Sequence, residues 1–187
     1  MTQPNHSLER TQPQRGFMYD VAVLRRSARS RYAALGSRLR ASFHSSAEED
    51  LQMELTELND FGRRYAEAWC SQDPYSVAAF FSEDGSLSVN DGAPAVGRQA
   101  IAQVAQGFMT DFPDMVVTMD ALEPGSESTV FHWTLTGTNT GPGGTGNRVR
   151  ISGYEVWRIG ADALVAESKG HFDSADYEYQ LQHGVGK

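Results

Sequence analysis

The 187-residue sequence predicts an α+β domain in which helices pack on one face of an antiparallel sheet. Three observations lead to this class. Apolar residues recur at helical spacing in the first regular part of the chain. Strand-like segments replace them in the second part, and short Gly-containing loops separate those segments. Helices followed by strands are typical of α+β proteins, whereas parallel-sheet proteins alternate the two.

The helical part begins near residue 51. Apolar residues three or four positions apart mark one face of a first helix that ends near Gln72. They are Leu51, Leu55, Leu58, Phe61, Tyr65 and Trp69. Asp73 before Pro74 is typical of a helix start and predicts a short second helix with Phe80 and Phe81 on its apolar face. A third amphipathic helix is expected from Gly97 to Met109.

Strand-like segments make up most of the remainder. They are Ser86 to Asn90, Met115 to Glu123, Thr129 to Thr140, Arg148 to Ile159 and Leu164 to Phe172. The loops between the last four are of hairpin length, so we expect them to be neighbours in an antiparallel sheet. The Gly-rich loop at 141–146 lacks the Lys of a phosphate-binding loop. A last short helix is expected over Ser174 to Gln182.

Composition excludes several classes. The chain is 40% hydrophobic and 21% charged, as globular proteins are, and no apolar run is long enough to span a membrane. The single cysteine, Cys70, forbids an intrachain disulfide and leaves no cysteine cluster for zinc. The sequence contains no His-Glu-x-x-His string and no calcium loop. We therefore expect neither a metal nor a cofactor.

Charge divides the chain at one place. Residues 1–47 hold eight arginines against two acidic residues, a net charge of +6, whereas the remaining 140 residues hold eight basic against 22 acidic residues, a net charge of −14. We expect a basic, disordered extension over 1–50 and the folded domain over 51–187. The acidic domain is not expected to bind nucleic acid.

The extension has three interpretations. Its Arg- and Ser-rich, acid-poor composition is typical of a mitochondrial transit peptide. It is also consistent with an arm for anionic partners, or with an extension without function upstream of a true start at Met53. A cytoplasmic protein is expected, or a mitochondrial one if the extension is a transit peptide.

Strand alternation singles out Glu155. Along Arg148 to Ile159, one face carries mostly apolar residues and also this carboxyl group. A carboxylate there loses most of its hydration, so it must be paired, be kept protonated, or face a cavity. It is either a structural carboxyl or a group that lines a pocket. Tyr65 raises a similar question, because its phenol lies in the apolar face of the first helix and needs an internal partner.

The order of these elements and several local strings together resemble the nuclear transport factor 2-like superfamily, and within it the SnoaL-like group. The resemblance covers residues from Leu51 onward. Its strings are Tyr65-Ala66-Glu67-Ala68-Trp69, Phe80-Phe81-Ser82-Glu83-Asp84-Gly85, Val96-Gly97-Arg98-Gln99-Ala100-Ile101, Gly137-Thr138-Asn139-Thr140-Gly141, Gly153-Tyr154-Glu155-Val156-Trp157-Arg158 and Gly170-His171-Phe172-Asp173. It implies a cone in which three N-terminal helices pack on a curved antiparallel sheet and enclose a pocket, and it implies a homodimer.

Two enzyme groups of this superfamily suggest roles for particular residues. Ketosteroid isomerases use a Tyr on the first helix, a general-base Asp at the end of the first strand and a protonated Asp on a later strand. Those roles fall on Tyr65, on Asp91 or its neighbour Asn90, and on Glu155. The implied chemistry is proton abstraction beside a carbonyl group, with Tyr65 and Glu155 holding the enolate oxygen.

SnoaL-type polyketide cyclases instead use a His in the string that matches Gly137 to Gly141, and an Asp where Glu155 stands. Asn139 replaces that His, which leaves Glu155 as the matched acid or base. His132 and His171 lie on predicted strands and are candidate substitutes, although a lone strand His is more often structural.

His171 and Asp173 share a strand face, so they form either a hydrogen-bonded dyad or simply a polar strand end. The expected catalytic residues are Glu155, Tyr65, Asp91 and His171, and the expected ligand contacts are Trp69, Phe80, Trp133, Asn139 and Trp157. We expect the domain to bind or convert a small apolar carbonyl compound by acid/base chemistry of the cyclase or isomerase type. The alternative is a non-catalytic module that binds a small molecule or mediates dimerisation.

Overall fold

The computed structural model of the chain describes residues 55–186. The expected basic extension, with its three interpretations, lies outside the described residues. Within the described part, no helix is both long enough and apolar enough to cross a membrane.

Three helices precede or interrupt the early strands, as expected. The first occupies residues 55–70 of the described chain. Next comes α2 (Pro74–Ala78), which starts at Asp73, whose carboxylate accepts a hydrogen bond from the Tyr75 amide at 3.0 Å. The third, α3 (Arg98–Asp111), buries its apolar face, including Ile101 and Ala105. A fourth helix, α4 (Ser174–His183), follows the last strand.

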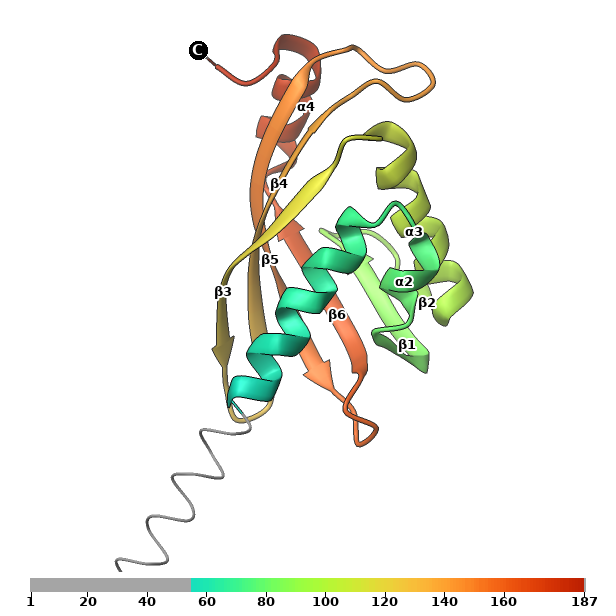
Figure 1. Cartoon of the computed structure of the whole chain (residues 1–187), viewed down its shortest axis with the longest axis vertical. Coiled ribbons are helices and arrows are strands. Elements are labelled where there is room, and N and C mark those ends of the chain that lie inside the picture. Colours follow the sequence, from blue (N-terminus) through green and yellow to red (C-terminus); the bar gives the residue numbers. More distant parts are fainter. Residues whose placement is uncertain (1–54, 187) are drawn as a thin grey trace, which may run out of the picture. The chain divides into compact units, whose positions relative to one another are not determined.

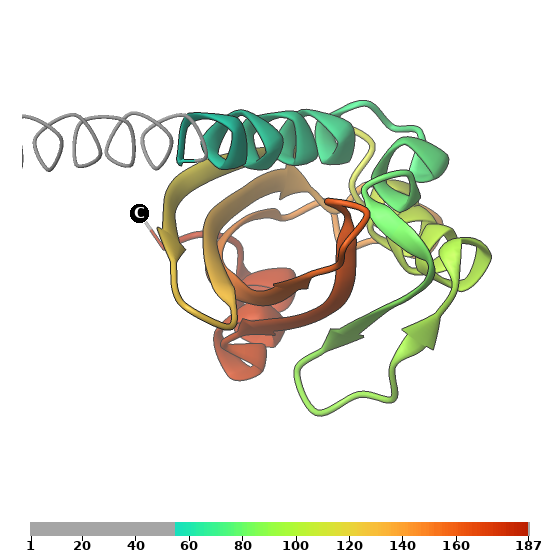
Figure 2. The same ribbon diagram turned by 90° about the horizontal axis from the view of Figure 1, so that it is seen from below.

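The described strands form one six-stranded sheet. They are β1 (Phe81–Val89), β2 (Ala95–Val96), β3 (Val116–Pro124), β4 (Thr129–Thr138), β5 (Arg148–Ile159) and β6 (Val165–Phe172). The order across the sheet is β2-β1-β6-β5-β4-β3. Every neighbouring pair is antiparallel except β1 and β6, which run parallel. The sheet curves strongly, and the helix at 55–70 lies across its concave side (Figures 1 and 2).

The expected α+β class and cone fold are confirmed, with two local differences. The expected second helix includes Phe80 and Phe81, but α2 ends at Ala78, so Phe80 lies after the helix and Phe81 is the first residue of β1. An irregularity between Phe81 and Ser86 breaks the alternation of this strand, so only its second half looked like a strand. The parallel pairing of β1 with β6 also departs from the expected antiparallel sheet, since it joins segments far apart in the sequence.

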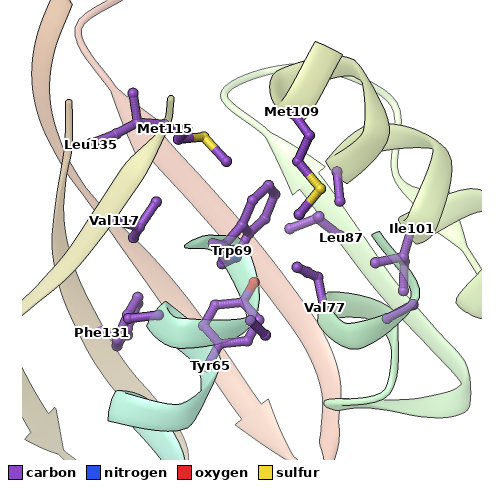
Figure 3. Close-up of a cluster of buried hydrophobic side chains, with 14 of the residues drawn as sticks. Tyr65, Trp69, Val77, Leu87, Ile101, Met109, Met115, Val117, Phe131 and Leu135 are labelled. Atoms are coloured by element: carbon purple, nitrogen blue, oxygen red, sulfur yellow. The ribbon is translucent and has the colours of Figure 1, made fainter. Parts of the chain in front are cut away.

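The first helix approaches the sheet closely. A Cβ atom at Gly62 would lie 2.7 Å from Met119 Sδ and 2.9 Å from Leu122 Cδ1, so a larger residue would require these two side chains of β3 to move. Tyr65 and Trp69 follow on the same face. They project between Val117 and Phe131 on one side and Leu87 on the other (Figure 3). The core therefore lies between this helix and the concave face of the sheet.

The C-terminal helix completes an open sheet edge. Residues 148–152 of β5 have no partner in β6, because Phe172, the last residue of β6, pairs with Gly153. The Gln180 side chain takes the place of a strand there, accepting from Arg150 N at 2.7 Å and donating to Arg150 O at 3.1 Å. Tyr177 of α4 packs against Phe172, with ring centroids 5.5 Å apart. Helix α4 is thereby fixed beside the core.

Candidate functional site

A small cavity lies between the helices and the concave face of the sheet. Its volume is about 50 Å³, which is room for about three or four water-sized groups. Its lining consists of Trp69, Leu87, Val89, Phe108, Val117, Phe131, Trp133, Leu135, Glu155, Gly170 and Phe172. Ten of these eleven residues are apolar or aromatic or glycine, so Glu155 is the one titratable side chain in the lining.

Glu155 occupies the inner face of β5, as strand alternation predicted. Its neighbours on this face, Ile151 and Trp157, are also buried, and Glu155 itself is 6% exposed. No arginine or lysine pairs with it among the described ion pairs. Three neutral side chains bind it instead.

The three donors converge on one oxygen of the carboxyl group. Ser168 Oγ donates to Glu155 Oε2 at 2.6 Å, Trp157 Nε1 donates at 2.8 Å and Tyr65 Oη donates at 3.1 Å. Among the described residues, Oε1 receives only a 3.4 Å contact from the same tyrosine. The two oxygens therefore have different surroundings: Oε2 is enclosed by donors and Oε1 is nearly free.

Burial and hydrogen bonding act on the charge of Glu155 in opposite directions. Removal from water raises its pKa above the ordinary value, whereas the hydrogen bonds from Ser168, Trp157 and Tyr65 lower it. The effect of burial is the larger, and the net pKa is raised. A raised pKa favours the neutral acid, which can donate a hydrogen bond as well as accept one.

Tyr65 finds its internal partner in Glu155. The side chain is completely buried, and its ring makes edge-on contacts with five aromatic neighbours. Burial, followed by the nearby Glu155 carboxyl, raises its pKa well above the ordinary value, and a side-chain hydrogen bond with Trp69 opposes this. The phenol therefore stays protonated and serves as a donor to Glu155.

The structure separates the expected ligand contacts into two groups. Trp69 and Trp133 line the cavity. Phe80 and Trp157 are outside the lining: Phe80 packs on the Tyr65 ring at 5.5 Å, and Trp157 stacks on Phe131 at 4.6 Å. Trp157 contributes to the site indirectly, because its indole N–H donates a hydrogen bond to the Glu155 carboxyl.

Asp91 and His171 lie elsewhere. Both border a hollow that also includes Tyr154 and Asp173, rather than the cavity. Alternation separates His171 from Glu155, because Gly170 and Phe172 line the cavity whereas His171, between them, faces outward with its ring tilted against that of Tyr154 at 5.0 Å. Asp91 lies in the turn after β1. The carboxylate of Asp173 caps α4 by accepting from the amides of residues 175 and 176. No hydrogen bond joins Asp173 to His171 among the described residues, so the polar strand end, rather than the dyad, is the interpretation that fits.

His132 and Asn139 also have local roles. His132 faces away from the cavity, and its Nε2 lies 3.4 Å from Glu123 Oε1 without hydrogen-bond geometry. Asn139 is buried, accepts from Thr145 N at 2.8 Å and donates to Asp111 O at 3.2 Å. Its side chain orders the Gly-rich loop between β4 and β5 rather than facing the cavity.

Ser168 is the polar contact that the sequence did not reveal. Alternation along β6 places it inward, on the same face as Gly170, but its distance from Glu155 depends on the pairing of Trp157 with Ser168 across β5 and β6. Register between strands is not readable from one sequence. Most apolar lining residues, such as Leu87 and Phe108, were recognisable as core positions but not as walls of a cavity.

Within residues 55–186, no group of three or more His, Cys, Asp or Glu side chains could hold a metal ion. The lining of the cavity likewise offers a single carboxyl group. The chemistry that this site supports is therefore binding of a small apolar molecule with one acid/base group at hand.

Solved structures with this fold come from several bacteria. A protein with a ketosteroid isomerase-like fold from Catenulispora acidiphila, in complex with trimethylamine, has a TM-score of 0.57 and 15% identity, covering 63% of this chain and 88% of its own. A candidate SnoaL-like polyketide cyclase from Jannaschia sp. CCS1 has a TM-score of 0.58 and 19% identity, covering 66% and 89%. A phenazine biosynthesis-related protein from Pseudomonas aeruginosa has a TM-score of 0.56 and 15% identity, covering 72% and 94%.

These similarities show the fold alone, because proteins with sequence identities of 15–19% and the same fold often differ in function. No protein of curated function matches the sequence. The sequence profile of the SnoaL-like domain matches residues 62–168, which is more than half of the chain and contains Tyr65, Glu155 and Ser168. The chain belongs to the SnoaL-like domain family.

Proposed function

We propose that this domain binds a small apolar carbonyl compound in the cavity and that Glu155 is its acid/base group. The observation that carries the proposal is a buried carboxyl, free of any ion pair with the described residues, in a lining that is otherwise apolar. Burial of this kind raises the pKa of the carboxyl and so favours its neutral form, which can donate a hydrogen bond to a carbonyl oxygen.

The chemistry follows from that hydrogen bond. When a C–H bond beside a carbonyl group loses its proton to solvent, negative charge develops on the carbonyl oxygen. A neutral Glu155 that donates to this oxygen stabilises the charge within an otherwise apolar lining, while the proton passes to a water molecule that enters the cavity with the ligand. Tyr65 contributes indirectly, because its hydroxyl donates to Glu155 rather than lining the cavity.

The alternative, a non-catalytic binding module, is favoured by one observation. Isomerases of the kind discussed above use a second titratable group as a base, and Asp91 and His171 lie outside the lining of the cavity. Binding and proton transfer must therefore be measured separately.

Acetone is a suitable probe for both. It matches the small cavity, and its size is close to that of the trimethylamine bound to the structural neighbour from Catenulispora acidiphila. Binding is followed by backbone amide shifts in NMR titrations of the wild type, Glu155→Gln and Glu155→Leu. Because the Gln amide still donates a hydrogen bond, we expect Glu155→Gln to bind acetone, whereas Glu155→Leu weakens binding about tenfold, the effect of one hydrogen bond.

The hydrocarbon 2-methylpropene, which has the shape of acetone but no oxygen, is the matched control and should bind all three proteins alike. Proton transfer is measured as exchange of acetone hydrogens in D2O. We expect the wild type to accelerate exchange more than Glu155→Gln, because a carboxylic acid can transfer its proton to the enolate oxygen whereas an amide can only donate a hydrogen bond to it. Binding without any exchange would support the non-catalytic alternative, and equal affinity of the wild type and Glu155→Leu for acetone would refute a role for Glu155.

We also propose that the domain forms a homodimer, as the family resemblance implies. Val116 and Tyr154 are large apolar side chains exposed on the outer face of the sheet, at 50% and 41%, and are where we expect the contact.

A further inference from the structure

We propose that Ser168 is a positioning residue that keeps the proton of neutral Glu155 on Oε1, the oxygen left free for the cavity, so that the site takes ligands that accept a hydrogen bond. This inference rests on the function proposed above. It adds a residue that acts through Glu155 and names the oxygen atom that meets the ligand.

Of the groups around Oε2, the indole of Trp157 can only donate, and the hydroxyl of Tyr65 is placed to donate as well. The indole of Trp157 carries an N–H and no acceptor, so its 2.8 Å bond occupies Oε2 whatever the charge of Glu155. The hydroxyl of Tyr65 takes part in a side-chain hydrogen bond with Trp69, whose indole is again only a donor. The hydrogen of Tyr65 is therefore the one directed at Glu155 Oε2.

The role of Ser168 decides the position of the proton. Its hydroxyl is 1% exposed and lies 2.6 Å from Glu155 Oε2, its only hydrogen-bond partner among the described side chains. If the serine accepted a proton from Oε2, its own hydrogen would be buried without an acceptor, which is costly. If it donates, every hydrogen around Oε2 is satisfied.

With three donors at Oε2, the neutral acid carries its proton on Oε1. That oxygen has only the 3.4 Å contact with Tyr65, a group already committed to Oε2. The lining beside Glu155 has no Lys, Arg or His, so Tyr65 is the one other titratable group in contact with this carboxyl. The carbonyl oxygen of a ligand in the cavity thus supplies the acceptor for the hydrogen on Oε1, which the described residues do not supply.

The two orientations of Ser168 give opposite results when the hydroxyl is removed. A donor stabilises the charged form of Glu155, so its loss in Ser168→Ala raises the pKa of Glu155, by about one unit. An acceptor stabilises the neutral form, so its loss lowers the pKa. A hydroxyl that serves only packing leaves the pKa unchanged.

The measurement is a titration of the Glu155 carboxyl carbon by NMR in the full chain, without ligand. We expect a rise in Ser168→Ala, and either a fall or no change overturns the proposal. Ser88→Ala is the matched control, because Ser88 Oγ lies 3.5 Å from the Ser168 carbonyl oxygen and has no hydrogen bond to Glu155. It should leave the pKa of Glu155 as in the wild type.

If Ser168→Ala does not fold, Ser168→Cys tests the same hydroxyl. The thiol is a much weaker donor than the hydroxyl that lies 2.6 Å from Oε2, so this variant must also raise the pKa of Glu155, and a fall or no change overturns the proposal. Because neither measurement uses a ligand, failure of acetone to bind would refute the proposed function and leave this test intact.

Discussion

Replacing Glu155 by Gln should make the protein more stable than the wild type at high pH. The burial that raises the pKa of Glu155 above its ordinary value of 4.5 means that the folded protein holds the proton more tightly than the unfolded chain does. This contribution to stability is complete below the unfolded-state pKa and is lost as the pH rises through the folded-state pKa. The wild type therefore loses free energy of unfolding as the pH increases.

The size of this loss is set by the shift. Each unit by which the folded-state pKa exceeds the unfolded value corresponds to about 1.4 kcal/mol. In Glu155→Gln, the amide oxygen can accept from Ser168, Trp157 and Tyr65, and the amide nitrogen takes the place of the protonated Oε1. At low pH we expect the two proteins to agree within about 1 kcal/mol. At high pH the free energy of unfolding of the variant exceeds that of the wild type by the amount that corresponds to the full pKa shift of Glu155.

Urea unfolding at a series of pH values, followed by tryptophan fluorescence, measures the difference. Glu167→Gln is the control: its carboxylate is 38% exposed and lies 3.3 Å from Lys169 Nζ, so it should follow the wild-type curve. If the curves of Glu155→Gln and the wild type run parallel from about pH 4 to pH 9, the pKa of Glu155 is the same in the folded and unfolded states, and the reasoning fails.

Four further predictions concern the surroundings of the site. Tyr65→Phe removes a buried donor and should lower the free energy of unfolding by about 1–2 kcal/mol, measured by urea unfolding. Gly170→Ala puts a methyl group 3.7 Å from Glu155 Cγ in the wall of the cavity and 3.3 Å from the Ser88 carbonyl oxygen, which must shift slightly, and it should weaken acetone binding in NMR titrations. Asn139→Ala should destabilise the protein by about 1–3 kcal/mol without changing acetone binding, because its amide orders a loop. Light scattering should give twice the chain mass of 20.6 kDa, and a monomer mass would refute the homodimer.

The periodicity of apolar residues was sufficient to predict most helices and strands and to predict that the Glu155 side chain points inward. The bounds of β5 agree with the expected strand, because its alternation is unbroken from Arg148 to Ile159. Alternation failed for β1, where an irregularity between Phe81 and Ser86 interrupts it. Local pattern therefore predicts an element well when nothing long-range distorts it.

Contacts between distant segments were predicted less well. Tyr65 and Glu155 were each expected to need a partner, but only the fold shows that they are partners of each other. Ser168 joins them through a strand register that a single sequence does not specify. His171 and Asp91 had suitable chemistry for a site, yet the pleat of β6 and the turn after β1 place them beside another hollow.

The position of β6 has a consequence for how the protein is made. Although β6 is the last strand in the sequence, it lies in the middle of the sheet, between β1 and β5. A nascent chain that emerges from the ribosome in sequence order therefore holds β1 without its parallel partner until residues 165–172 have been synthesised. Ser168 is among those residues, so Glu155 receives its complete set of donors only when the sheet is joined.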